Sequence, residues 1–188
     1  MAHFALTIPV MTAVLLLCQV VRTASADYER ADPPRMLAAS AQATAFYVEF
    51  RAREEAGGYG HSYVTLGEID TSGGARQTIV AGFLPDGADS DRWSKVGLPV
   101  AGTVGVTRSD IAGRHHARFR VSISRVQYFR VVRAIHRLRR TWTTYELLLR
   151  NCNSFASQIA GSVGLRTPMV TAQYPVRYVA ELRSLNAR

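Results

Sequence analysis

Cys152 is the residue whose type and setting point most directly to chemistry. It lies between two asparagines, and apolar residues at helical spacing follow it. Asn151 is a favourable N-cap residue, so we expect Cys152 in the first turn of a helix. The free amides and the dipole of a helix start stabilise a thiolate and lower the pKa of a thiol by about one to several units. The same amides could bind the oxyanion of an acyl-transfer reaction.

A second interpretation of Cys152 stays open. Cys152, Phe155 and Ile159 lie at positions i, i+3 and i+7, so all three could face the protein core. A single cysteine is by default a small buried hydrophobic residue. A base beside the sulfur would separate the two interpretations.

His61 is the candidate base. It begins the alternating sequence HSYVTLGE, directly after the glycine-rich sequence EEAGGYG. This pattern predicts a strand that starts at His61 and holds its imidazole near the margin of a sheet. A helix that packs its cysteine-bearing face onto that sheet would bring Cys152 toward His61, which makes the minimal nucleophile–base pair. The alternative is a strand-end histidine bound to the backbone.

Cys152 and His61 must be positioned by the surrounding strands and helices. The order of these elements in the sequence predicts an α+β fold, with an antiparallel sheet first and helices later. Alternation predicts a meander of strands over 44–83, the first with one buried face, and another strand over 117–124. Residues 85–113 are rich in Gly, Asp and Pro, with one short strand expected at 100–106. Helices are expected from the cap Ser124 to about residue 142, from Cys152 to a Schellman ending at 164–165, and over 176–185.

The amino-terminal residues 1–26 are predicted to form a signal peptide. Residues 5–21 carry no charge, and Ala24-Ser25-Ala26 fits the cleavage pattern, which places the cut before Asp27. We therefore expect an exported protein, periplasmic or secreted, with a retained membrane anchor as the alternative. A flexible lead-in at 27–43 and a single domain at 44–188 would follow. Cleavage removes Cys18 and leaves Cys152 as the one thiol, so no internal disulfide is expected.

Composition narrows the class of protein further. The 188 residues are 47% hydrophobic and 20% charged, which excludes a disordered or low-complexity chain. The formal net charge is +9, and the stretch 111–145 holds nine arginines and no acidic residue. We interpret this stretch as a solvated basic face, with weak affinity for anionic polymers or membranes as the alternative. Specific nucleic-acid binding is not expected, since no aromatic side chains alternate with the arginines. His115, His116 and His136 predict no metal site.

The two candidate segments together resemble a known superfamily. GHSYVTLG, followed about ninety residues later by YELLLRNCNSFASQIAGSVGL and a proline, is similar to the circularly permuted papain-like proteins. The likeness is greatest to the PPPDE thiol peptidases, with NlpC/P60-type hydrolases and lecithin–retinol-acyltransferase-like proteins as wider kin. The resemblance covers about residues 61–168. It implies a permuted papain-like fold, with Cys152 as the nucleophile and His61 as the base.

The expected function is that of an exported thiol hydrolase that cleaves an amide, ester or thioester bond without a metal or cofactor. Its substrate would be a peptide or acyl compound, with cell-wall peptides implied by the superfamily alone. The helix-start amides, with Asn151 or Asn153, would hold the oxyanion. Gln77, Thr78 or Glu49 on the neighbouring strands would orient His61. An acyltransferase and an inactive binding module with a basic anion-contacting face are the alternatives.

Overall fold

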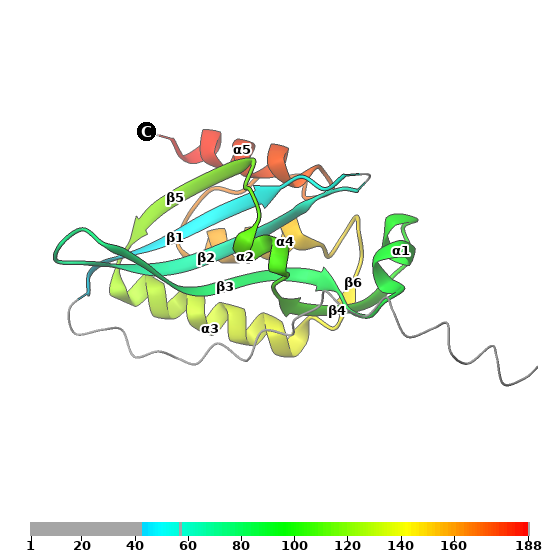
Figure 1. Ribbon diagram of the computed structural model, residues 1–188, viewed down its shortest axis with the longest axis horizontal. Coiled ribbons are helices and arrows are strands. Elements are labelled where there is room, and N and C mark those ends of the chain that lie inside the picture. Colours follow the sequence, from blue (N-terminus) through cyan, green and yellow to red (C-terminus); the bar gives the residue numbers. More distant parts are fainter. Residues whose placement is uncertain (1–42, 57, 188) are drawn as a thin grey trace, which may run out of the picture.

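Three long strands form the centre of one sheet. The computed structural model describes residues 43–56 and 58–187, in which β1 (Ala43–Arg53), β2 (His61–Asp70) and β3 (Ala75–Pro85) follow one another as antiparallel hairpins (Figure 1). The sheet is completed by β4 (Val100–Gly105), β5 (Ala117–Ile123) and the two-residue β6 (Thr144–Tyr145), in the order β5-β1-β2-β3-β4-β6. The predicted meander and both later strands are confirmed.

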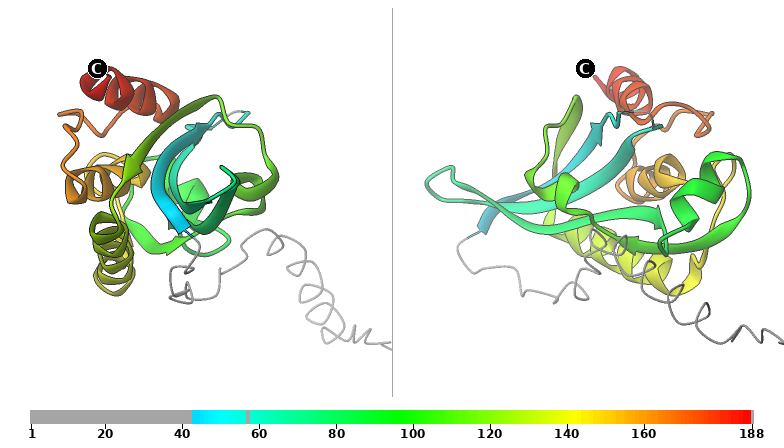
Figure 2. Two further views of the ribbon diagram at one scale, coloured as in Figure 1. Left: turned by 90° about the vertical axis from the view of Figure 1, so that its left-hand side faces the viewer. Right: turned by 45° about the vertical axis from the view of Figure 1, so that its right-hand side comes forward.

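Three helices cover one face of this sheet. They are α3 (Arg125–Thr141), α4 (Cys152–Ser162) and α5 (Pro175–Asn186), which lie beside one another in Figure 2. Ser124 and Gln127 form a capping box at the start of α3. After α4, the amide of Leu165 bonds to the carbonyl of Ala160, the Schellman bond that the sequence predicts. The chain is thus α+β, with all three expected helices present.

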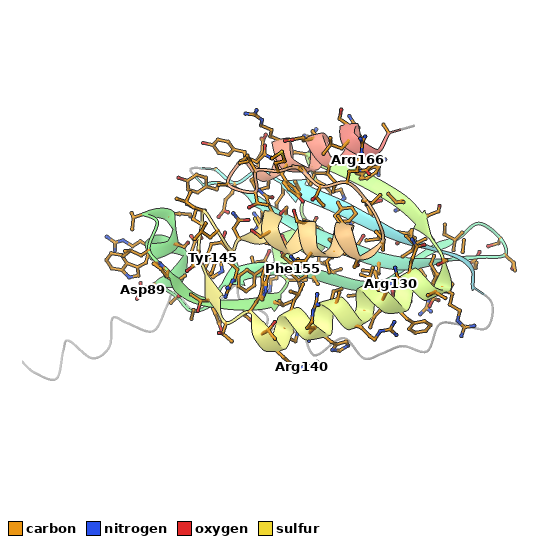
Figure 3. The ribbon with its side chains drawn as sticks, turned by 180° about the vertical axis from the view of Figure 1, so that it is seen from behind. Asp89, Arg130, Arg140, Tyr145, Phe155 and Arg166 are labelled. Carbon is orange, nitrogen blue, oxygen red and sulfur yellow. The ribbon has the colours of Figure 1, made fainter. Side chains whose placement is uncertain are left out.

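The connection between β3 and β5 contains two short helices that the sequence did not predict. They are α1 (Ser90–Lys95) and α2 (Arg108–Ala112), of six and five residues. Neither is long enough to show an apolar period, so only capping residues could reveal them. Thr107 and Asp110 supply such a signal, a reciprocal capping box at the start of α2. Figure 1 shows α2 in front of the sheet, whereas α3 and α4 lie in front when the molecule is seen from behind in Figure 3.

The expectation that β1 has only one buried face is wrong. Tyr47 and Glu49 belong to the predicted polar face, yet both are buried. The Glu49 carboxylate accepts hydrogen bonds from Arg51 and, at 2.5 Å, from Arg120, whose guanidinium lies over the Tyr47 ring. β1 lies between β5 and β2, and cationic side chains from its own and a neighbouring strand cover its second face. A buried carboxylate is tolerated there because it is paired.

The predicted signal peptide and its cleavage site, and the lead-in up to residue 42, lie outside the described residues. Within residues 43–56 and 58–187, none of the helices combines the length and apolar character needed to cross a bilayer.

Candidate active site

Cys152 is the first residue of α4, as the sequence predicts. The side-chain oxygen of Asn151 accepts a hydrogen bond of 2.9 Å from the Ser154 amide, which fixes the start of the helix. The thiol is 6% exposed and lines a groove in the protein surface. The thiol is therefore mostly buried, but a ligand in that groove can still reach it.

His61 is the first residue of β2 and interacts directly with Cys152. Burial is the largest influence on His61 and favours the neutral imidazole, but the charge of Asp110 and the hydrogen bond and charge of Cys152 outweigh it. The pKa of His61 is therefore raised. Burial likewise acts to raise the pKa of the Cys152 thiol, but the hydrogen bond to His61, its charge and hydrogen bonds from Ser62 lower it below its usual range. Both shifts favour a thiolate–imidazolium pair.

Asp110 is the acidic residue that faces the other side of the imidazole. Its Oδ2 lies 3.7 Å from Nε2 of His61, too long for a hydrogen bond but close enough for charge attraction. Arg53 Nε donates to Oδ1 and the Thr107 amide donates to Oδ2, each at 2.8 Å. Burial acts to raise the pKa of Asp110, but the charge of His61 and these hydrogen bonds outweigh it, so the pKa is lowered. With Nε2 facing Asp110, Nδ1 is the ring nitrogen left for the sulfur.

The residues that were expected to orient His61 lie elsewhere, and Asp110 was not among them. Gln77 is exposed and pairs with Gly67, while Thr78 bonds to the carbonyl of Leu66 and to the hydroxyl of Tyr128. Neither residue is brought to His61, because the start of β3 lies beside the end of β2 in an antiparallel hairpin. Glu49 is engaged by two arginines and is likewise not at His61. The capping pattern that begins at Thr107 was the one signal that could have located Asp110.

The side-chain amides of Asn151 and Asn153 are engaged in hydrogen bonds to neighbouring loops. The Asn151 side-chain amide donates to the carbonyls of Leu147 and Thr171 at 2.6 and 3.3 Å. Asn153 donates to the carbonyls of Thr171 and Gln173 at 2.9 and 2.8 Å and accepts from the Ser62 hydroxyl at 2.8 Å. Both side-chain amides, which the sequence offered as possible oxyanion donors, thus donate to backbone carbonyls here.

The hydroxyl of Tyr145 interacts with Cys152. Burial raises its pKa most, and the charge and thiol hydrogen bond of Cys152 raise it further, whereas the Cys152 backbone amide acts in the opposite direction. The hydroxyl of Tyr145 therefore lies beside both the sulfur and the first amide of α4. Its ring packs against Phe83 with 5.5 Å between centroids, which holds it in place.

Two lobes of one groove meet at these residues. The lobe on the side of Cys152 has a volume of about 300 Å³, and the lobe on the side of His61 about 480 Å³. Tyr59, Gly60, Tyr145 and Leu147 line both lobes. A ligand that fills the groove would therefore pass over the thiol and the imidazole together.

The described residues hold no cluster of three His, Cys, Asp or Glu side chains that could bind a metal ion. His115 lies 3.1 Å from the Tyr63 hydroxyl, and His116 accepts a hydrogen bond from the Glu54 amide. Each of these two neighbouring histidines thus has a partner of its own.

Replacing Asp110 with asparagine should shift the reactivity of Cys152 to higher pH. Asparagine keeps an oxygen for the Thr107 amide but removes the charge that holds the pKa of His61 up, so the thiolate loses part of its counterion. We expect alkylation at about pH 6 to slow about tenfold and its acidic limb to move toward alkaline pH. Stopped-flow alkylation with iodoacetamide measures this. Asp89→Asn, an exposed carboxylate that makes no cap hydrogen bond, is the control.

Protein-family models, curated proteins and solved structures were compared with the chain, and it matches none of them.

Proposed function

We propose that the protein is a thiol hydrolase in which Cys152 is the nucleophile, His61 the general base and Asp110 the group that orients His61. The observation that carries this proposal is the convergence of the three side chains, with Cys152 and His61 lining an open groove and Asp110 buried behind the imidazole. The pKa of the thiol is lowered and that of the imidazole raised, as a preformed ion pair requires. A buried structural cysteine would have neither a basic partner nor access to a groove.

The first half of the reaction forms an acyl-enzyme. The proton of Cys152 resides on His61, and the thiolate attacks the carbonyl carbon of an amide, ester or thioester. The carbonyl oxygen becomes an oxyanion that accepts hydrogen bonds from the Cys152 amide and the Tyr145 hydroxyl. When the intermediate collapses, His61 gives its proton to the leaving nitrogen, oxygen or sulfur, and a thioester to Cys152 remains.

The second half releases the acyl group. His61, now neutral, takes a proton from a water molecule, whose oxygen attacks the thioester carbon. The thiolate leaves, His61 keeps the proton, and the product is a carboxylic acid. Asp110 acts throughout by stabilising the imidazolium and by holding Nε2, so that Nδ1 remains directed at the sulfur.

Alkylation of Cys152 at mildly acidic pH tests the proposal without a known substrate. An ordinary thiol, with a pKa of about 8.5, is almost fully protonated at about pH 6, whereas a thiolate–imidazolium pair reacts there. We expect rapid labelling of Cys152 and a loss of about a hundredfold in His61→Ala. Mass spectrometry separates the Cys152 peptide from Cys18, which serves as an internal reference where the amino-terminal segment is present.

His136→Ala is the matched control, because His136 lies on α3 and the loss of its imidazole leaves the groove unchanged. Equal labelling of the parent and His61→Ala at about pH 6, in folded protein, contradicts the proposed pair. Labelling only after denaturation would assign Cys152 to the core instead.

A further inference from the structure

In the part of the chain that the structure describes, the exposed large apolar side chains are concentrated at one place. Among the described residues, eleven large apolar side chains are exposed, and nine of them come from four segments around the groove. We call these nine the apolar rim. They are Tyr59, Trp93, Val96, Leu98, Leu148, Leu149, Met169, Val170 and Tyr174. The two others, Ile111 and Val126, lie on α2 and at the start of α3.

Hydrogen bonds at the start of α4 hold two of these segments together. The Asn151 amide donates to Leu147 in the 146–150 turn and to Thr171 in the 169–174 loop. The Ser154 hydroxyl lies 3.0 Å from the Leu149 carbonyl and 3.2 Å from the Thr171 hydroxyl. Hydrogen bonds therefore hold the part of the apolar rim beside Cys152 in a defined arrangement.

The remaining segments complete the apolar rim around the groove. The Tyr59 ring packs against Tyr174 with 5.8 Å between centroids, which ties the turn before β2 to the 169–174 loop. α1 borders the lobe beside His61 through Asp91, Ser94 and Lys95. α1, the 146–150 turn and the 169–174 loop share one end of the molecule in Figures 1 and 2, and Figure 3 labels Asp89 and Tyr145 at that end.

We propose that the apolar rim docks on a lipid bilayer, so that the groove opens toward the membrane surface. An exposed apolar surface of this extent around a groove marks an interaction site. Its composition fits the occupant, because Trp and Tyr prefer the level of the lipid headgroups and Leu, Val and Met the acyl chains below.

Charges of both signs border the apolar rim, which fits a bilayer with zwitterionic headgroups. Arg92, Arg150 and Arg177 are exposed beside or within the apolar rim, but acidic residues border it as well, among them the exposed Asp89 and the groove-lining Asp91. The arginines of the stretch 111–145, which account for the net charge of +9, lie outside the four segments of the apolar rim. Insertion of the apolar side chains therefore provides most of the expected attraction.

The docking has a consequence for substrate choice, and this step rests on the proposed hydrolase function. A groove that opens onto a bilayer receives an acyl compound that is anchored in the membrane. Leu147, Leu148 and Tyr174 line the lobe beside Cys152 and give an apolar path from the bilayer to the thiol. The expected substrate class is therefore a lipid-linked amide, ester or thioester.

Tryptophan fluorescence of the full chain tests the docking directly. The chain has two tryptophans, the exposed Trp93 in the apolar rim and Trp142, which packs against Phe83, and residues 1–42 contain none. Binding of the amino-terminal segment alone therefore leaves the emission unchanged. Phosphatidylcholine vesicles should shift the emission to shorter wavelength, and brominated lipid should quench it. Trp93→Phe should remove both responses.

A pair of matched variants separates the apolar rim from apolar exposure in general. Leu149 and Met169 are 77% and 99% exposed and do not line the groove, so we expect Leu149→Ser/Met169→Ser to fold normally and to reduce the quenching about tenfold. Ile111→Ser/Val126→Ser removes two side chains that are 58% and 65% exposed elsewhere and should leave the quenching unchanged.

The outcomes distinguish the two proposals. Equal quenching in both double variants, or no response of Trp93 to either neutral or anionic vesicles, overturns the docking. Dimerisation of the parent that Leu149→Ser/Met169→Ser abolishes, without a vesicle response, would overturn it as well and assign the apolar rim to a second copy of the chain. Alkylation of Cys152 at about pH 6 reports separately on the hydrolase site in each of these variants.

Discussion

We expect Gly82→Ala to abolish the enhanced reactivity of the Cys152 thiol, although Gly82 does not line the groove. Gly82 lies on β3, and a Cβ atom built there would lie 2.4 Å from Nε2 of His61 and 3.2 Å from Cβ of Tyr63. The imidazole is buried, and its ring stacks beside that of Tyr63 with 6.0 Å between centroids. The imidazole must therefore shift, which disturbs its geometry toward Asp110 and Cys152.

The expected loss of activity is large because a displaced imidazole loses its position as general base and no longer keeps Cys152 ionised. A displacement of about 1 Å in a catalytic group costs about a hundredfold in rate, and loss of a general base costs about a hundredfold or more again. We expect Gly82→Ala to lower hydrolysis of an activated thioester at least about a thousandfold and to match His61→Ala in alkylation at about pH 6. Overpacking should also lower the free energy of unfolding by about 1–3 kcal/mol.

Gly161→Ala is the matched control for this substitution. A Cβ at Gly161, near the end of α4, meets no atom within 4 Å. We expect unchanged alkylation and a small gain in stability, up to about 1 kcal/mol, because alanine favours the helix. Parent-like alkylation and hydrolysis in Gly82→Ala would show that the imidazole does not depend on its place against β3.

Removal of the Tyr145 hydroxyl should separate acyl transfer from thiol reactivity. The hydroxyl lies beside the sulfur and the first amide of α4, where the oxyanion of a bound carbonyl would form. Loss of one such donor lowers turnover by about a hundredfold to a thousandfold. Alkylation by iodoacetamide forms no oxyanion. We therefore expect Tyr145→Phe to lose hydrolysis of the thioester while its alkylation at about pH 6 stays within about threefold of the parent.

Tyr128→Phe provides the comparison. Its hydroxyl bonds to Thr78 at 3.0 Å, so its loss should lower the free energy of unfolding by about 1 kcal/mol and leave turnover unchanged. The Phe83 contact remains available to a phenyl ring at position 145, so the fold should persist in both variants. A parallel fall of alkylation and hydrolysis in Tyr145→Phe would assign the hydroxyl to thiolate formation rather than to the oxyanion.

Local signals in the sequence were sufficient for the two central residues of the candidate site. The N-cap before Cys152 and the glycine-rich turn before His61 both act within a few residues, and the structure has the helix and the strand where these signals predict them. The meander followed from alternation for the same reason. These features depend on the periodicity of one element at a time.

Features that depend on neighbouring strands could not be derived in this way. Asp110 reaches His61 from a five-residue helix, and nothing in the sequence of that helix indicates His61 as its partner. Gln77 and Thr78 were assigned to His61 because they lie on the next strand, but hairpin direction places them at the far end of β2. Glu49 is buried because Arg120 from β5 covers it, which alternation within β1 does not reveal.

The candidate site draws on three segments that are widely separated along the chain. His61 opens β2, Asp110 lies on α2 and Cys152 opens α4, and His61 meets the other two only once the sheet has formed. In an unfolded chain the thiol has no imidazole partner and its pKa returns to the ordinary value of about 8.5. Such long-range contacts form late in folding. Synthesis and any export of the unfolded chain would therefore proceed with a thiol of ordinary reactivity, and the activated nucleophile would form only at the place where the protein folds.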